Sequence, residues 1–195
     1  TRYGLGSFIP ESQVDKWALY RVARYCDELV PNGLGGYEPR FTCNLYLQSR
    51  EQAYKVVQDM ASIFRGMAYW SGGAITVTQD APQDAVYQFT AANVIGGEFA
   101  YQGSSARARH TVALVSWVDP DDFYRQKVEY VEDMAGIARY GVVQADVVAM
   151  GCTSRGQANR VGKWLLYSEQ SESEIITFRT GLEGAVVRPG DVIKV

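Results

Sequence analysis

Residues 154–195 constrain the fold most, because they carry clear start and stop signals for successive elements. Ser154 and Gln157 have the spacing of a capping box, in which a hydroxyl and a side-chain amide each satisfy backbone groups at a helix start. The pattern predicts a helix that continues to about Ser168. The side chains expected to face a core recur at helical spacing: Ala158, Val161, Leu165 and Tyr167.

A strand and a turn are predicted after this helix. Residues 174–180 alternate in polarity, with Ile176 and Phe178 on one face, which indicates a half-buried strand. Pro189 and Gly190 fit the central positions of a type II turn, where proline presets φ and glycine accepts a positive φ. We therefore expect two further strands joined by that turn. This region is a scaffold and carries no reactive group.

The N-terminal part of the chain predicts a helix and a strand. Pro10, Ser12 and Asp15 supply the chemistry of a helix start, in that order a fixed φ, a capping oxygen and a negative charge, and the helix is expected to run to about Leu29. Residues 40–47 then alternate between apolar and polar side chains, which indicates a half-buried strand. The apolar residues at helical spacing in the helix are Val14, Trp17, Ala18, Val22, Tyr25, Cys26 and Leu29.

A second helix and a hairpin are predicted next. Ser49 and Gln52 form another capping-box pattern, and residues 53–67 present one continuous apolar face. The methionine and aromatic side chains of that face could line a cofactor, but core packing is the favoured interpretation. Gly72 and Gly73 have the composition of a two-residue hairpin turn.

Residues 80–84 have the composition of a linker and divide the chain in two. We expect a small α/β unit over residues 1–80 and a second unit over residues 85–195, in an α+β fold with mostly antiparallel strands and one helix packed on the second unit. The strands predicted in the second unit cover residues 86–90, 111–117, 126–131 and 142–149, with a short helix over 132–139.

Composition and charge exclude several functional classes. The chain has 195 residues and a net charge of −3, without the basic stripe that nucleic-acid binders usually show. No apolar run approaches the roughly 18 residues of a membrane-spanning helix. Cys26, Cys43 and Cys152 are odd in number and far apart, which favours reduced, mostly buried thiols over a disulfide framework or a zinc site. These thiols suit synthesis in a cytoplasm.

Three acidic side chains and one histidine are the candidates for chemistry. His110 is the single histidine, so any Ser-His-Asp or Cys-His scheme must use it, but a packed or partner-contacting role is favoured. Asp119, Asp121 and Asp122 could in principle hold a cation. They lack the glycine and the terminal glutamate of an EF-hand loop, so a helix start with Pro120 at its first position is favoured.

Two glycine-containing stretches invite comparison with phosphate-binding loops. Residues 33–36 follow a helix, whereas such a loop follows a strand and opens a helix. Residues 156–163 have the wrong spacing, and Trp164 stands where serine or threonine is needed. We therefore expect no catalytic, cofactor-binding or metal-binding residues and no cofactor.

Several motifs nevertheless resemble one protein family. They cover nearly the whole chain in order: Tyr37 to Cys43, Ser49 to Tyr54, Ala92 to Ile95, Gly103 to Ser105, Ala108 to Thr111, Asp119-Pro120 before Phe123-Tyr124, Gly151 to Ala158, Gly181 to Gly184 and Arg188 to Gly190. In these motifs the chain resembles the tip attachment protein J family, the tail-tip hub or host-specificity proteins of lambda-like tailed bacteriophages.

This resemblance implies a structural, non-enzymatic component of the virion tail tip, made in the bacterial host cytoplasm. Three copies would surround the DNA-ejection channel and link the tail to host-recognition regions, in contact with other tail-tip and tape-measure proteins. The resemblance also implies a peripheral α/β domain followed by a β-barrel-like hub domain, expected to be cut at Val195. No specific nucleic-acid binding and no membrane insertion are expected.

Two rival functions stay open. A receptor- or glycan-binding module would expose aromatic side chains, whereas the four tryptophans mostly fall on predicted core faces: Trp17, Trp70, Trp117 and Trp164. A tail-associated hydrolase would need a carboxylate pair, or a nucleophile with a base, and a single histidine makes that scheme poor.

Overall fold

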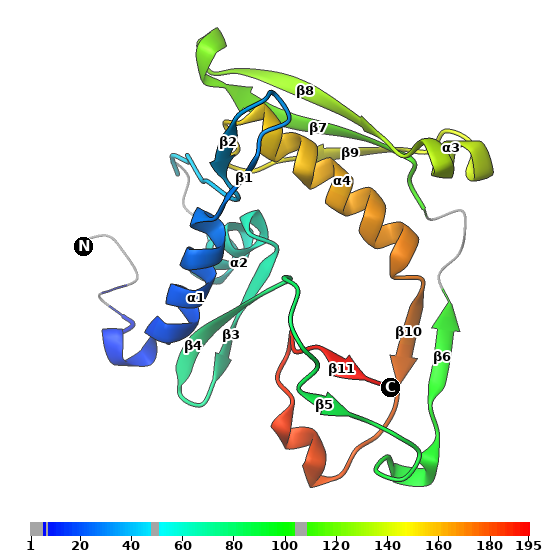
Figure 1. Cartoon of the computed structure of the whole chain (residues 1–195). Coiled ribbons are helices and arrows are strands. Elements are labelled where there is room, and N and C mark those ends of the chain that lie inside the picture. Colours follow the sequence, from blue (N-terminus) through cyan, green and yellow to red (C-terminus); the bar gives the residue numbers. More distant parts are fainter. Residues whose placement is uncertain (1–5, 7, 48–50, 104–108) are drawn as a thin grey trace. The chain divides into compact units, whose positions relative to one another are not determined.

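The computed structural model describes residue 6 and residues 8–47, 51–103 and 109–195. Its α+β fold combines helices with small, mostly antiparallel sheets, as the sequence predicts (Figure 1). The α-helices in this part of the chain are α1 (Lys16–Asp27), α2 (Ala53–Ile63), α3 (Met134–Tyr140) and α4 (Arg155–Ser171).

The backbone contacts define two compact units. One unit comprises residues 1–80, 115–129 and 148–161, and the other comprises 81–114, 130–147 and 162–195. Helix α4 therefore contributes residues to both units. The assignment of residues 1–80 and 85–195 to separate domains stays a prediction.

The first unit contains two hairpins. Strand β1 (Leu29–Pro31) pairs antiparallel with β2 (Tyr37–Pro39), and β3 (Gly66–Ser71) pairs antiparallel with β4 (Ala74–Gln79). Gly72 and Gly73 connect β3 to β4 with φ of 60° and 81°, values that glycine adopts at little cost. The predicted hairpin is thus confirmed.

Helix α1 begins at Lys16, later than predicted, because Asp15 rather than Ser12 caps it and Ser12 lies in the preceding 3-10 turn Glu11–Gln13. The Asp15 carboxylate accepts hydrogen bonds from the backbone N–H groups of Trp17 and Ala18 at 3.1 and 3.0 Å. Ala18 and Val22 are buried, but Trp17 is 75% exposed, so its predicted place in the core is wrong. Only the face at the spacing of Ala18 and Val22 is covered, and the Trp17 ring contacts Tyr20 edge-on at 6.5 Å instead.

The predicted strand over residues 40–47 does not form. Phe41 is buried, but the residues after it pair with no neighbouring strand. Their backbone groups bond instead to the side chain of Gln157 and to the carbonyl of Gly151. A local alternation of polarity cannot show whether a neighbouring strand or other groups will bond to the backbone of such a segment.

The start of α2 is only partly described. Ser49 of the predicted capping box lies outside the described residues, and Gln52 makes no capping side-chain bond. Helix α2 ends at Ile63, four residues before the predicted end at Met67, because Gly66 already begins β3. Ala61 and Ala68 are buried between these elements.

The second unit holds two small sheets. Strand β5 (Tyr87–Gln88) pairs parallel with β11 (Ile193–Lys194), and β6 (Ala100–Gly103) pairs antiparallel with β10 (Glu174–Thr177). Phe178 packs between two other rings, with centroids 4.8 Å from Phe89 and 5.2 Å from Phe99.

The C-terminal turn forms, but it does not join two strands. Asp191 donates a backbone hydrogen bond to the Arg188 carbonyl at 3.0 Å, and Gly190 has φ of 89°. The residues before the turn form a 3-10 helix, Leu182–Val186, rather than the expected strand. The backbone N–H of Val187 donates to the Gly184 carbonyl and caps the end of this helix. The run of valines in the sequence gives no indication of this contact.

A three-stranded sheet has the order β8-β7-β9, from β8 (Arg125–Glu132), β7 (Val112–Asp119) and β9 (Gln144–Val148). The most buried side chains of β7 and β8 are Val112, Ala113, Val115, Trp117 and Val131. Each sheet in the described residues has two or three strands, so these strands do not close into a barrel. Short strands interrupted by 3-10 turns leave too few neighbours for closure.

Candidate functional site

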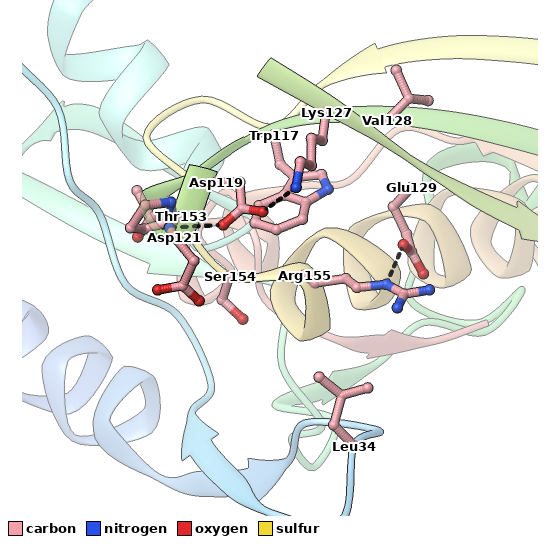
Figure 2. A pocket seen from close by; sticks show the side chains of 11 residues that line it. Leu34, Trp117, Asp119, Asp121, Lys127, Val128, Glu129, Thr153, Ser154 and Arg155 are labelled. Carbon is pink, nitrogen blue, oxygen red and sulfur yellow. Dashed lines mark hydrogen bonds and ion pairs between the residues drawn. The ribbon is translucent and has the colours of Figure 1, made fainter. Parts of the chain in front are cut away.

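A polar pocket of about 600 Å³ lies in the first unit, at the start of α4 (Figure 2). The ends of β7 and β8, the turn between them, the first residues of α4 and one loop side chain form its wall. The lining residues are Leu34, Trp117, Asp119, Pro120, Asp121, Lys127, Val128, Glu129, Thr153, Ser154 and Arg155.

The predicted capping box at α4 is half formed. The Ser154 hydroxyl accepts a hydrogen bond from the Gln157 backbone N–H at 3.3 Å and donates one to the Glu38 carboxylate. The side chain of Gln157 does not return to Ser154, as the capping box predicts, but reaches the segment around Thr42. The Gln157 side chain therefore makes a tertiary contact in place of the local capping bond.

Gln157 and Thr42 form a three-bond contact. The side-chain oxygen of Gln157 accepts hydrogen bonds from the Thr42 N–H and hydroxyl, both at 3.0 Å, and its Nε2 donates to the Thr42 carbonyl at 3.1 Å. Asn44 continues the docking, with its N–H 2.8 Å from the Gly151 carbonyl and its Nδ2 2.7 Å from the Thr153 hydroxyl. Side chains make most of these hydrogen bonds, whereas a strand would be held by regular backbone hydrogen bonds to a neighbouring strand.

Arg160 ties the β2 region to the same helix. Its Nη1 lies 2.6 Å from Glu38, and both side chains are about four-fifths buried, at 21% and 19% exposure. Its Nη2 donates to the carbonyl of Arg40 at 3.0 Å and to that of Pro39 at 3.4 Å. One guanidinium thus bonds a carboxylate and two backbone groups at once.

Four charged side chains of the pocket form two ion pairs, as Figure 2 shows. Lys127 lies 2.6 Å from Asp119, and Arg155 Nε lies 2.7 Å from Glu129. Glu129 is nearly buried and also accepts from Asn159 at 3.1 Å. Lys127 holds the pKa of Asp119 below its usual range, and Glu129 raises the pKa of Arg155.

One lysine pairs with two of the three aspartates of the acidic cluster considered from the sequence. Lys127 Nζ lies 2.6 Å from Asp119 and 3.4 Å from Asp122. Asp119 caps the 3-10 turn Pro120–Asp122 as predicted, accepting from the Asp121 N–H at 3.0 Å. Among the described residues, no three or more His, Cys, Asp or Glu side chains lie in an arrangement that could hold a metal ion.

His110 belongs to the second of the two compact units. Its Nδ1 is 2.9 Å from both Glu169 carboxylate oxygens, and its backbone N–H donates to Glu169 at 2.7 Å. Gln170 adds a bond to the His110 carbonyl at 3.4 Å. These contacts fit the packed role that the sequence analysis favours.

The three cysteines are free thiols. Burial raises the pKa of all three, so the nucleophilic thiolate is disfavoured at neutral pH. Cys152 is buried and Cys26 is half-buried, but Cys43 is exposed, which corrects its expected burial.

The glycine stretches do not form phosphate loops. Asn32 accepts hydrogen bonds from the N–H groups of Leu34 and Gly36 at 2.8 and 3.0 Å, so these amides are already used within the loop. A Cβ at Gly156 would meet the Asn32 carbonyl at 2.7 Å, which shows that this glycine lets Asn32 approach α4 closely.

No helix in the described part of the chain combines the length and apolar character that a bilayer crossing requires.

Comparisons with known proteins agree with the motif resemblance. A family model described as a putative phage tail protein matches residues 52–195. The chain is 41% identical over 194 residues to the tip attachment protein J of Escherichia phage SECphi27, and 34% identical over 195 residues to that of Escherichia phage SECphi4. Each match covers all of this chain but only 16% or 17% of the relative.

The chain therefore belongs to this phage tail protein family. It spans about a sixth of the length of the two relatives.

The sequence reasoning missed the partners that build the site. The sequence pattern predicts a local cap for Gln157, and it gives no indication that Glu129 and Arg155 form a pair. A glutamine on the apolar side of a helix, beside Ala158 and Val161, is the one signal that could have indicated a buried polar contact.

Proposed function

We propose that this chain is a structural part of the phage tail tip, contributing to a hub of three copies around the channel through which DNA leaves. The observation that carries the proposal is that the whole of this chain matches a part of two tip attachment proteins. In the virion the hub would connect the tail with host-recognition regions, and its neighbours would be other tail-tip proteins and the tape-measure protein. The chain would be made in the host cytoplasm.

The site supports a structural role. Its cations are engaged by carboxylates at 2.6 and 2.7 Å, and its polar side chains fasten the segment around Thr42 to α4. Such paired groups stabilise a fold but offer neither an activated nucleophile nor a free base to a substrate. We infer a non-enzymatic function on this basis.

The net charge of −3 suits a component beside a DNA channel. Each phosphate that a protein neutralises adds salt-dependent affinity, so a basic lumen would retain the genome. A ring also requires head-to-tail contacts between two different patches on each copy.

A glycan-binding module is the second candidate. Trp17 and Trp70 are 75% and 57% exposed, although the sequence pattern places most of the four tryptophans on core faces. Exposed tryptophans can stack on sugar rings, so a glycan array with Trp17→Ala and Trp70→Ala variants is the corresponding test. A signal lost in either variant would favour this candidate.

Immunogold labelling of purified virions tests the structural proposal. Antibodies against this chain should label the tail end that contacts the cell, and mass spectrometry should find the chain in washed particles. A protein recovered only from the lysate, or a purified chain that releases fragments from cell walls, would contradict a structural role.

A further inference from the structure

Two exposed aromatic residues form the turn between β7 and β8. Phe123 is 86% exposed and Tyr124 is 69% exposed. Both have left-handed backbone conformations, with φ of 53° and 57°, where glycine or asparagine is usual. The turn thus keeps two large apolar side chains in solvent at positions that disfavour them.

Ion pairs connect the residues on either side of this aromatic turn. Lys127 contacts Asp119 at 2.6 Å and Asp122 at 3.4 Å, and Arg125 lies 3.6 Å from Asp122. Residues in sparsely populated backbone regions cluster at functional positions such as active sites, ligand clamps and switch regions. A preordered aromatic turn loses little conformational entropy on binding.

An apolar recess of about 190 Å³ lies on the same unit, between α2 and the β3-β4 hairpin. Tyr54 and Val57 of α2 line one side, and Ala68, Trp70 and Ile75 of the hairpin are among the residues that line the other. Tyr54 and Trp70 are 71% and 57% exposed. Apolar cavities of about 150 Å³ accept a benzene ring, so this recess has room for one aromatic side chain.

We propose that the aromatic turn of one copy inserts Phe123 into the recess of a second copy. The two surfaces differ, so the contact is head-to-tail, and each copy keeps a free turn or a free recess for another neighbour. This inference rests on the proposed hub function and names the surfaces through which copies would join.

The area involved predicts a weak contact. Phe123, Tyr124, Tyr54 and Trp70 are the aromatic side chains available, and each buries roughly 150–250 Å² when fully covered. The roughly 600–1,000 Å² total is below the roughly 1,200–2,000 Å² of a stable interface. We therefore expect association only at high concentration, and in the tail only with support from neighbouring contacts.

Sedimentation velocity from about 1 µM to about 1 mM tests the contact. The wild-type mass should rise with concentration, and Phe123→Gly should raise the dissociation constant at least about tenfold. Glycine suits the positive φ at this position, so the fold should be retained. Leu182→Ala, at a side chain that is 93% exposed, is the control and should associate like the wild type.

The recess is tested by Tyr54→Glu, which places a charge at its rim. Tyr167→Glu is the matched control, because Tyr167 is also an exposed helical tyrosine, at 72% against 71%. Phe123→Gly keeps an intact recess and Tyr54→Glu keeps an intact turn. An equimolar mixture should therefore form dimers and nothing larger, while each variant alone stays monomeric.

The contact is overturned if the wild type is monomeric at about 1 mM, or if the mixture stays monomeric. It is also overturned if the wild type associates and Phe123→Gly leaves that association unchanged. These outcomes leave the hub proposal standing, because virion labelling decides it independently.

Discussion

The side-chain amide of Gln157 bonds to both backbone groups of Thr42, accepting from its N–H at 3.0 Å and donating to its carbonyl at 3.1 Å. The two residues are 115 positions apart, and Gln157 is 2% exposed. A buried side-chain amide thus takes the role of a neighbouring strand. This contact fixes the extended segment against the start of α4.

Gln157→Ala should lower the free energy of unfolding by about 1–3 kcal/mol, because it leaves the Thr42 backbone groups without partners. For a chain of this size the midpoint of thermal unfolding should fall by several degrees. Gln126→Ala is the control, at an exposed strand position. Equal melting curves for the two variants would show that the Gln157 contact is not stabilising.

Arg160→Lys should destabilise the fold although the charge is kept. Lysine can retain the ion pair with Glu38, but it cannot also reach the Arg40 and Pro39 carbonyls with a planar fork. We expect a loss of about 1–2 kcal/mol in urea unfolding. Arg125→Lys, whose side chain is 73% exposed, should change stability by less than about 0.5 kcal/mol. Indistinguishable midpoints would contradict the role of the fork.

Gly151→Ala should destabilise for two reasons. Gly151 has φ of 63°, and a Cβ there would lie 2.9 Å from the Cys43 sulfur. Gly35→Ala separates the two effects, because Gly35 has φ of 89° but open space around its Cβ position. The cost at Gly35 should be about 1 kcal/mol and the cost at Gly151 larger. If the two costs are equal in chemical denaturation, the close approach to Cys43 has no energetic effect.

The Asp119 and Lys127 pair predicts an acid-sensitive contribution to stability. The hydrogen bond from Lys127 lowers the pKa of Asp119 in the folded chain, so this contribution is present above the ordinary pKa of about 3.9 and is lost as the pH falls through the lowered value. Asp119→Asn keeps the capping oxygen but removes the charge.

The melting temperatures of the wild type and Asp119→Asn should therefore differ at pH 6–7 and converge below about pH 4. Added salt should also reduce the difference, since Lys127 is 44% exposed. A difference that stays constant from pH 7 to pH 3 would exclude the charge as its cause.

Much of the local structure could be predicted from the sequence, because its signals are local. The cap at Asp119 and the turn at Gly72 and Gly73 depend on residues a few positions apart. The fold class follows from the same helix and strand periods.

The site could not be predicted because its parts are distant in sequence. Arg160 and Glu38 are separated by 122 positions, and no sequence feature near either residue indicates which residue it pairs with. Trp17 shows the same limit, since helical spacing cannot tell which residues of an apolar face find a neighbour.

An electron cryomicroscopy reconstruction of the tail tip, from a phage that carries this chain, tests the central claim most directly. We predict density for this fold at the tip of the tail, in three copies around the channel axis. A tail tip without this fold, or with a number of copies other than three around the axis, would contradict the hub account.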